Sequence, residues 1–369
     1  KRQAMEPAEP PLSESSFQAW RQAAQQFAAD AVTRFLEIER NDPGWSRDHD
    51  QERADLIDQL HQIGHLREAR ALVHRWLLGY RDRLVITPSR TAARREHLWR
   101  CIADVVERTA DQRLLETFWI SLASIRLPAR EDSASPLPLM GVPIMNRFDL
   151  LERLLQSIDH PIDTLAIVDN SGGQGDLSDQ LSHLQQQGHP LIQRIEIASP
   201  FRNLGVAGSW NHILTSFPEA AVALLANNDV CFTPGALHTS LSAVDDHEPC
   251  FLPLLPAPNS FSAFLITHQT WDLLGLFDEN FYPAYCEDME FLERLESRPE
   301  VSTIRLDDVQ KQMAEHNPEQ SATIHSDAEL ASFNRFSFQL NRLWLLSRRR
   351  HLGDPRGTWL RRWLSQWAS

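Results

Sequence analysis

Four polar clusters in the second half of the chain stand out because each one directly follows a short apolar segment. The clusters are Asn146-Arg147, Asp169-Asn170-Ser171, Asn203-Leu204-Gly205 and Asn227-Asn228-Asp229. If the apolar segments end at one edge of a sheet, the carboxylate, amide and backbone N–H groups of these clusters form a single cleft. Such a cleft can hold a nucleotide diphosphate together with a metal ion.

Alternating strands and helices are the elements that would position these clusters. The pattern predicts strands at 139–145, 164–168, 192–198 and 221–225, and helices at 150–157, 177–187 and 206–216. This alternation indicates a Rossmann-like α/β fold with a mainly parallel sheet flanked by helices. Ligands of such sheets bind beyond the carboxyl ends of the strands, where the four clusters stand.

The first third of the chain has a helical pattern and no catalytic constellation. We expect a disordered leader at 1–14, an all-α module at 15–127 and a Pro- and Ser-rich linker at 128–138 before the α/β domain at 139–333. Predicted helices cover 17–35, 54–63, 66–80, 89–109 and 111–125, and the second and third form a hairpin like one tetratricopeptide unit. Two interpretations stay open: a module that binds a protein partner or a second copy, and a cap that only stabilises the main domain.

Composition and charge exclude several classes of protein. The net charge of −14 over 369 residues argues against nucleic-acid binding. No stretch approaches the ~18 apolar residues of a membrane-spanning helix, and the first residues lack the apolar core of a signal peptide. The four cysteines form no CxxC pair, so free thiols in the cytoplasm are expected.

The last 36 residues, 334–369, are predicted to form a helical tail rich in tryptophan and arginine. Between Arg342 and Ser369 there are seven arginines and a single acidic residue, and Trp359, Trp363 and Trp367 share one helix face. This pattern suits peripheral contact with an anionic membrane, here the inner face of the cell membrane. Packing of the tryptophans on the N-terminal helices or on a second subunit is the alternative.

Five segments resemble glycosyltransferase family 2, whose members have the GT-A fold, and are most like its bacterial rhamnosyltransferases. The segments read GVPIMNRFDLLERLLQSI, IVDNSGG, NLGVAGSWNHIL, LLANNDV and FDENFYPAYCEDMEFLERL. The resemblance covers about 137–326. It implies a nucleotide-sugar transferase domain between an all-α N-terminal module and a helical tail.

The resemblance also implies which residues contact the donor. Pro143, Asn146 and Arg147 match the loop after the first strand, and Asp169 matches the acid that hydrogen-bonds the base. Residues 203–211 match the NxGxxxxxN element. From it we expect donor contacts by Asn203, Gly205, Val206, Trp210 and Asn211.

The metal ligands and the catalytic base follow from the same resemblance. Asn227-Asn228-Asp229 stands where the family carries its DxD metal motif, so Asp229 is the expected ligand of Mg²⁺ or Mn²⁺. Asn227 and Asn228, in place of carboxylates, would weaken that site and contact the donor instead. A late histidine completes the expected site: His316, or alternatively His325.

An inverting transfer also needs a base for the attacking hydroxyl. Asp288 is the expected base, and Glu287 would orient either this base or the acceptor. The sequence thus predicts an inverting hexosyltransferase that uses a dTDP- or UDP-sugar, with dTDP-rhamnose as the family-level choice. The acceptor would be a glycan, a lipid-linked glycan or a protein, as in polysaccharide biosynthesis. The alternative is a non-catalytic scaffold that keeps a degenerate transferase fold.

Overall fold

The computed structural model of the chain describes eight ranges, and everything below concerns these residues. They are 14–41, 49–86, 96–123, 135–173, 175–309, 313–316, 328–349 and 359–366. The chain divides into two compact units, Lys1–Arg126 and Leu127–Ser369. Residues 1–13 of the predicted leader and 128–134 of the predicted linker lie outside the described ranges, while Glu14 is already helical.

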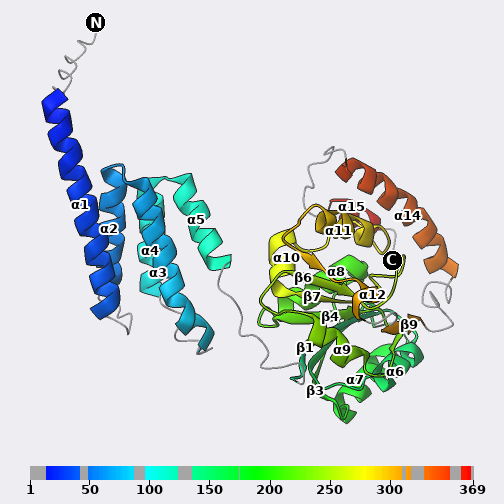
Figure 1. Cartoon of the computed structure of the whole chain (residues 1–369). Coiled ribbons are helices and arrows are strands. Elements are labelled where there is room, and N and C mark those ends of the chain that lie inside the picture. The colour runs from blue at the N-terminus through cyan, green and yellow to red at the C-terminus, as the bar shows by residue number, and fades with distance from the viewer. Residues whose placement is uncertain are drawn as a thin grey trace, which may run out of the picture. The chain divides into compact units, whose positions relative to one another are not determined.

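The first unit is all-α. Its helices are α1 Glu14–Asn41, α2 Asp50–Gln62, α3 Leu66–Ile86, α4 Glu96–Thr109 and α5 Gln112–Ala123 (Figure 1). The predicted hairpin corresponds to α2 and α3, which are joined by a turn in which Gly64 has a φ of +81°. The core of this unit is built from aliphatic residues around Phe35 and Trp76, both fully buried.

The second unit is built on a seven-stranded sheet. The strands are β1 Leu137–Ile144, β2 Ile162–Asp169, β3 Ile192–Ala198, β4 Val222–Ala226, β6 Cys250–Pro253, β7 Ala263–Thr267 and β8 Ser302–Thr303. Their order is β3-β2-β1-β4-β7-β6-β8, and the first four are mutually parallel. This confirms the predicted α/β class with a mainly parallel sheet. β1 starts two residues earlier than predicted because Leu137 pairs with Ile162 of β2.

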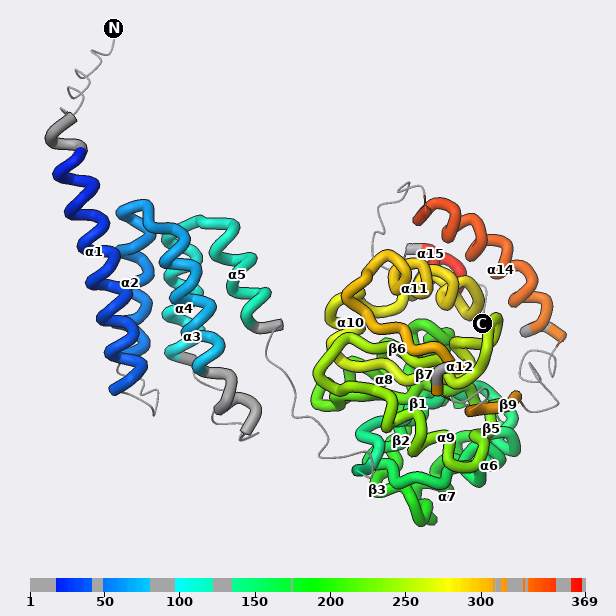
Figure 2. The backbone as a smooth tube through the Cα atoms, viewed as in Figure 1, coloured from blue at the N-terminus to red at the C-terminus, as the bar shows by residue number. Residues whose placement is uncertain are grey.

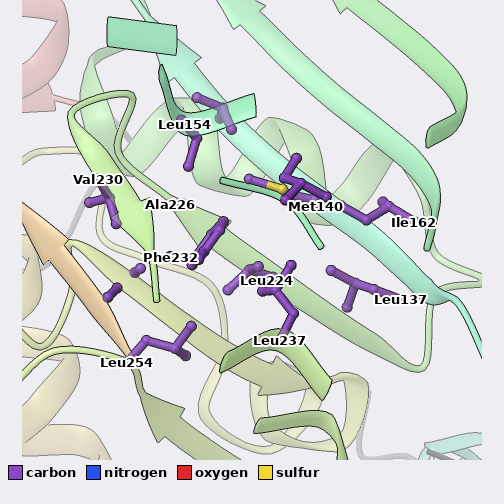
Figure 3. Packing of buried hydrophobic residues seen from close by; sticks show 14 of the residues in the cluster. Leu137, Met140, Leu154, Ile162, Leu224, Ala226, Val230, Phe232, Leu237 and Leu254 are labelled. Carbon is purple, nitrogen blue, oxygen red and sulfur yellow. The ribbon is translucent and has the colours of Figure 1, made fainter. Parts of the chain in front are cut away.

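Helices cover both faces of this sheet (Figure 1). Their bounds are α6 Phe148–Gln156, α7 Leu177–Gln187, α8 Gly205–Ser216, α9 Ala236–Ala243, α10 His268–Leu274, α11 Glu287–Glu296 and α12 Leu306–Val309. One core joins α6, α7 and α9 to side chains such as Met140 and Leu224 (Figure 3). The other core joins α8, α10 and α11 to Leu139 and Phe264. The two cores stabilise the sheet from both sides, so the ends of its strands are held in fixed register.

Gly141 lets α8 approach the sheet closely. A Cβ atom at this position would lie 2.7 Å from Cγ2 of Ile213 on α8 and 2.7 Å from Cδ2 of Leu225 on β4. A larger residue would have to displace the side chains of Ile213 and Leu225, and interiors at this density tolerate little extra volume. The packing of Ile213 and Leu225 against β1 therefore depends on the absence of a side chain at 141.

The C-terminal segment packs on the α/β unit rather than standing apart from it. α14 Ala328–Arg349 lies beside α11, to which it is joined by the ion pair of Arg348 with Glu290 (Figure 2). α15 Trp359–Leu364 follows it along the chain. Tyr282 is buried against Leu360 and Leu364 of α15. α14 also begins six residues before the predicted start of the tail, at Ala328.

Several charged and aromatic groups of these helices contact the same unit, while Phe336 and Phe338 of α14 are exposed. Nε1 of Trp344 donates to Asp278 over 2.9 Å, Arg349 pairs with Glu293, and Arg361 pairs with Glu279. Trp363 is partly exposed, whereas Trp367 and the side chain of Trp359 lie outside what the structure describes. The tail thus packs on its own α/β unit, which neither interpretation specified. Membrane contact and packing on the N-terminal helices or on a second subunit stay predictions.

None of the helices described is both long enough and apolar enough to cross a membrane.

Candidate active site

A cavity of about 390 Å³ lies where the carboxyl ends of β1 and β4 meet. This is the point where the order of the parallel strands reverses, since β2 and β3 extend from one side of β1 and β4 lies on the other. Sheets of this kind open a crevice at that point. Eleven of the predicted site residues line the cavity: Pro143, Asn203, Gly205, Val206, Trp210, Asn227, Asn228, Asp229, Glu287, Asp288 and His316.

The remaining four predicted residues, Asn146, Arg147, Asp169 and Asn211, are not among the lining residues. Asn146 joins two loops of the site, because its backbone carbonyl accepts from Nδ2 of Asn228 over 3.3 Å. Arg147 precedes the first residue of α6 and has a φ of +60°. Its guanidinium donates two hydrogen bonds, of 2.9 and 2.8 Å, to the carboxylate of Asp149. This pair lowers the pKa of Asp149 and directs the guanidinium toward its own helix.

Asp169 holds its own loop. One carboxylate oxygen accepts from the N–H of Ser171 over 2.9 Å, and the other accepts from Oγ of Ser178 on α7 over 2.8 Å. The side chain is buried, and these bonds tie the end of β2 to the next helix. Recognition of the donor's nucleobase by Asp169 stays a prediction. It would require the carboxylate to accept a further hydrogen bond from the nucleobase beside those from Ser171 and Ser178.

Asn211 fastens α8 to the chain after α10. Its Nδ2 donates to the carbonyl of Phe277 and to Glu279, while its Oδ1 accepts from the N–H of Phe277 over 2.9 Å. All three contacts are to protein, so this asparagine supports the wall of the cavity from behind. An asparagine in a ligand-binding motif and one in a helix clamp are alike in sequence.

Asn170 is a lining residue that the sequence reasoning did not select. Its Nδ2 donates to Oγ of Ser209 over 2.8 Å, and its Oδ1 accepts from the N–H of Leu204 over 2.9 Å. It therefore fixes the loop at 203–205 against β2. Asn170 belongs to the predicted strand-end cluster 169–171, in which the resemblance assigns donor contact to Asp169 instead.

Gly205 brings the loop at 203–205 against the loop at 282–285. Its φ is +70°, and a Cβ atom there would lie 2.7 Å from the carbonyl oxygen of Pro283. The N–H of Val206 donates to that same oxygen over 2.8 Å. Only glycine allows both the backbone angle and the close approach, so this position joins the two sides of the cavity.

Asp229 and His316 come together through a small two-stranded sheet. β5 Val230–Phe232 pairs antiparallel with β9 Ala314–His316, and Val230 lies opposite His316. Nδ1 of His316 is 3.9 Å from a carboxylate oxygen of Asp229, and both side chains are largely buried. Neither ring nitrogen of His316 has a hydrogen-bond partner among the described residues. A carboxylate oxygen and a ring nitrogen, both of kinds that bind metal ions in proteins, thus lie near each other.

These two side chains could contribute to a metal site but would not complete it. Within the described ranges, no three or more His, Cys, Asp or Glu side chains are grouped to hold a metal ion. A divalent cation at Asp229 and His316 would take its other ligands from a substrate or water, as a hard cation bound through phosphates does. His325 lies outside the described residues.

Glu287 and Asp288 begin α11 directly after a strained turn. Tyr285 and Cys286 both have left-handed backbones, with φ of +79° and +75°. Such angles are costly for residues with a side chain and persist only where the surroundings impose them. Asn341 of α14 provides support: its Nδ2 reaches the carbonyls of Tyr282, Ala284 and Tyr285 at 3.4, 2.9 and 3.2 Å.

Burial raises the pKa of both acids at this helix start. Burial raises the pKa of Glu287 well above its usual range, and the charge of Asp288 adds to this effect. Burial also raises the pKa of Asp288, against backbone N–H groups that favour its charged form. Burial thus increases the proton affinity of both carboxyls, and both residues line the cavity.

The charge of the cavity wall is unbalanced. Among the described lining residues there are three acids and no lysine or arginine, and most of the other polar groups are asparagine amides. Tyr285, Asn259 and Asn334 line the wall as well, although the sequence reasoning did not select them. A polyanion would meet no fixed positive side chain there, apart from His316 if it is protonated.

The pKa of Glu287 leads to a stability prediction. Between the unfolded pKa near 4.5 and the raised folded pKa, the folded chain keeps a proton that the unfolded chain loses, so stability falls as pH rises. Glu287→Gln cannot titrate. We therefore expect the difference in melting temperature, variant minus wild type, to be larger at pH 8 than at pH 5. Thermal denaturation of both proteins at the two pH values measures it. A difference that is the same at both pH values would contradict the assignment.

Comparison with models of known protein families found no match, and comparison with curated proteins found none either. Among solved structures, the chain is similar to TarS residues 1–349 from S. aureus, with a TM-score of 0.37 and 15% identity over 49% of this chain and 60% of that chain. It is also similar to GalNAc-T7 with UDP, GalNAc and Mn²⁺, with a TM-score of 0.37 and 9% identity over 60% of this chain and 57% of that chain. In each case the match spans less than two thirds of the solved chain.

Proposed function

We propose that the second unit is a GT-A glycosyltransferase domain that moves a sugar from a nucleotide-diphosphate donor to a hydroxyl with inversion. The observation that carries this proposal is the set of residues that line one cavity. Asp229 beside His316 and Asp288 with its raised pKa all line it, at the switch point of a mainly parallel sheet. These residue types suit a cation that is completed by the substrate and a base for the acceptor hydroxyl, which are the two requirements of such a transfer.

The charge of the wall favours dependence on a divalent cation. A nucleoside diphosphate carries several negative charges, and the described lining offers it acids and amides but no lysine or arginine. Asp229 and His316 would hold Mg²⁺ or Mn²⁺, which when bound would neutralise the diphosphate leaving group. Asn227 and Asn228 can donate hydrogen bonds to donor oxygens without adding negative charge.

Asp288 would act on the acceptor. Its carboxylate takes the proton of the acceptor hydroxyl while that oxygen forms a bond to the anomeric carbon. The bond from this carbon to the diphosphate oxygen breaks, and its electron pair leaves with the diphosphate. A base is most effective when its pKa approaches the working pH, so burial of this carboxyl serves the step. The donor is proposed to be a dTDP- or UDP-sugar, dTDP-rhamnose among them.

The proposed base predicts a loss of turnover that leaves the rest of the site in place. In Asp288→Asn, we expect donor turnover to fall about 10²- to 10⁴-fold because proton transfer is lost while the amide keeps the shape of the side chain. Release of nucleoside diphosphate from a panel of dTDP- and UDP-sugars with Mn²⁺ measures this. Asp179→Asn, an exposed acid of α7, is the matched control. Equal turnover in both variants would contradict the role, and no wild-type turnover with any donor would favour the scaffold.

The proposed cation site predicts a change in metal requirement. His316→Gln should raise the Mn²⁺ concentration that gives half-maximal turnover by about tenfold or more, since one of two protein ligands is weakened. The exposed His212 of α8, changed to Gln, is the control. Titration of the metal-free protein with Mn²⁺ in the presence of donor measures the effect. The same half-maximal concentration in both variants, or full activity in a chelator, would rule out this site.

A further inference from the structure

α14 contributes a side chain to the cavity that none of the assigned roles uses. Asn334 is one of the lining residues, and only 5% of it is exposed. Its backbone carbonyl accepts from Ser337, but its side-chain Oδ1 has no hydrogen-bond partner among the described residues. A buried amide oxygen without a donor is destabilising. A ligand in the cavity that donated a hydrogen bond to this oxygen would remove that cost.

α14 is held firmly enough to make this placement specific. Two turns further along the helix, the fully buried Asn341 donates to three carbonyls of the strained loop that precedes Glu287. Beyond it, Leu345 is buried against Phe281 and Cys286. The helix that carries Asn334 is thus attached to the loop that precedes Glu287 and Asp288.

Glu287 offers a second atom of the same kind. It is 5% exposed, it lines the same cavity, and its Oε2 has no hydrogen-bond partner among the described residues. Burial raises the pKa of this carboxyl, which in its protonated form can both accept and donate a hydrogen bond. A group with several hydroxyls could bond to the amide oxygen of Asn334 and to this carboxyl at once.

The charge of the cavity wall and its aromatic residues favour one kind of hydroxyl-bearing ligand. The described lining has no lysine or arginine to receive an anionic acceptor, and Asp288 would repel one. Tyr285 and Phe261 line the cavity as well, and aromatic rings provide flat apolar surface. These features fit a neutral sugar ring better than a phosphorylated or carboxylated group.

We propose that Asn334 and Glu287 form the acceptor subsite, and that the group bound there is a neutral carbohydrate whose hydroxyl donates to Oδ1 of Asn334. The inference rests on the proposed transferase function and assigns to α14 a direct part in acceptor binding. Asn334 would then determine how the sugar divides between a carbohydrate acceptor and water. Transfer needs the subsite, whereas hydrolysis of the donor uses water as the acceptor.

The test measures this division in the full chain. Wild type is given a donor that it hydrolyses, together with the methyl glycosides of rhamnose, galactose, glucose and N-acetylglucosamine. The ratio of glycosylated product to free sugar is recorded. We expect Asn334→Leu to lower this ratio tenfold or more for any glycoside that wild type uses. The glycoside concentration for half-maximal transfer should rise in parallel.

Two further variants keep the result interpretable. Gln339→Leu makes a similar change at an exposed amide of the same helix and should leave the ratio as in wild type. Asn334→Ala removes the amide without adding bulk, so it serves if the leucine variant does not fold. A ratio unchanged in a folded Asn334 variant would overturn the inference while the transferase proposal stands, as would active wild-type protein that uses none of the glycosides. Wild type without any donor turnover would overturn both.

Discussion

Three carboxyl groups and several asparagine amides line the wall of one cavity. No lysine or arginine is among its described lining residues. Two of the three, Glu287 and Asp288, have their pKa raised by burial, and the third, Asp229, lies beside His316. On the proposed function, such a wall would repel a free diphosphate and would bind one that arrives with a divalent cation. The proposed need for metal, the role of Asp288 as base and the neutral acceptor all follow from this distribution of charge.

The fold maintains this arrangement by joining segments that are distant in sequence. The loops after β1 and β4 are connected through Asn228 and the carbonyl of Asn146. Gly205 allows the loop before α8 to meet Pro283. On the other side, Asn341 of α14 supports the left-handed turn before α11. The strain of that turn is thus imposed from outside it, by a helix that also reaches the cavity through Asn334.

The parts that depend on local patterns could be predicted from the sequence. The predicted bounds of α7 and β3, 177–187 and 192–198, coincide with those observed, because apolar periodicity and flanking glycine and proline determine them. The convergence of the strand-end clusters also followed, since parallel strands end at one edge. The resemblance placed Asp229, Glu287 and Asp288, and all three line the cavity.

The parts that depend on tertiary contacts could not be predicted in the same way. Asp169 and Asn211 stand in the expected motifs, but their polar atoms are engaged by Ser178 and Phe277, contacts that no spacing reveals. His316 meets Asp229 only because β5 pairs with β9. Asn334 belongs to a segment that was interpreted as a separate tail, since arginine and tryptophan look alike on a membrane-facing helix and on a helix packed against acids.

The central claim is that this cavity binds a nucleoside diphosphate only together with a divalent cation. Calorimetric titration of the full chain with UDP and dTDP, in Mn²⁺ and in a chelator, tests it most directly. The account predicts that Mn²⁺ lowers the Kd of at least one of the two at least tenfold, because Asp229 and His316 then bind a cation that the diphosphate shares. Equal affinity with and without Mn²⁺ would contradict it.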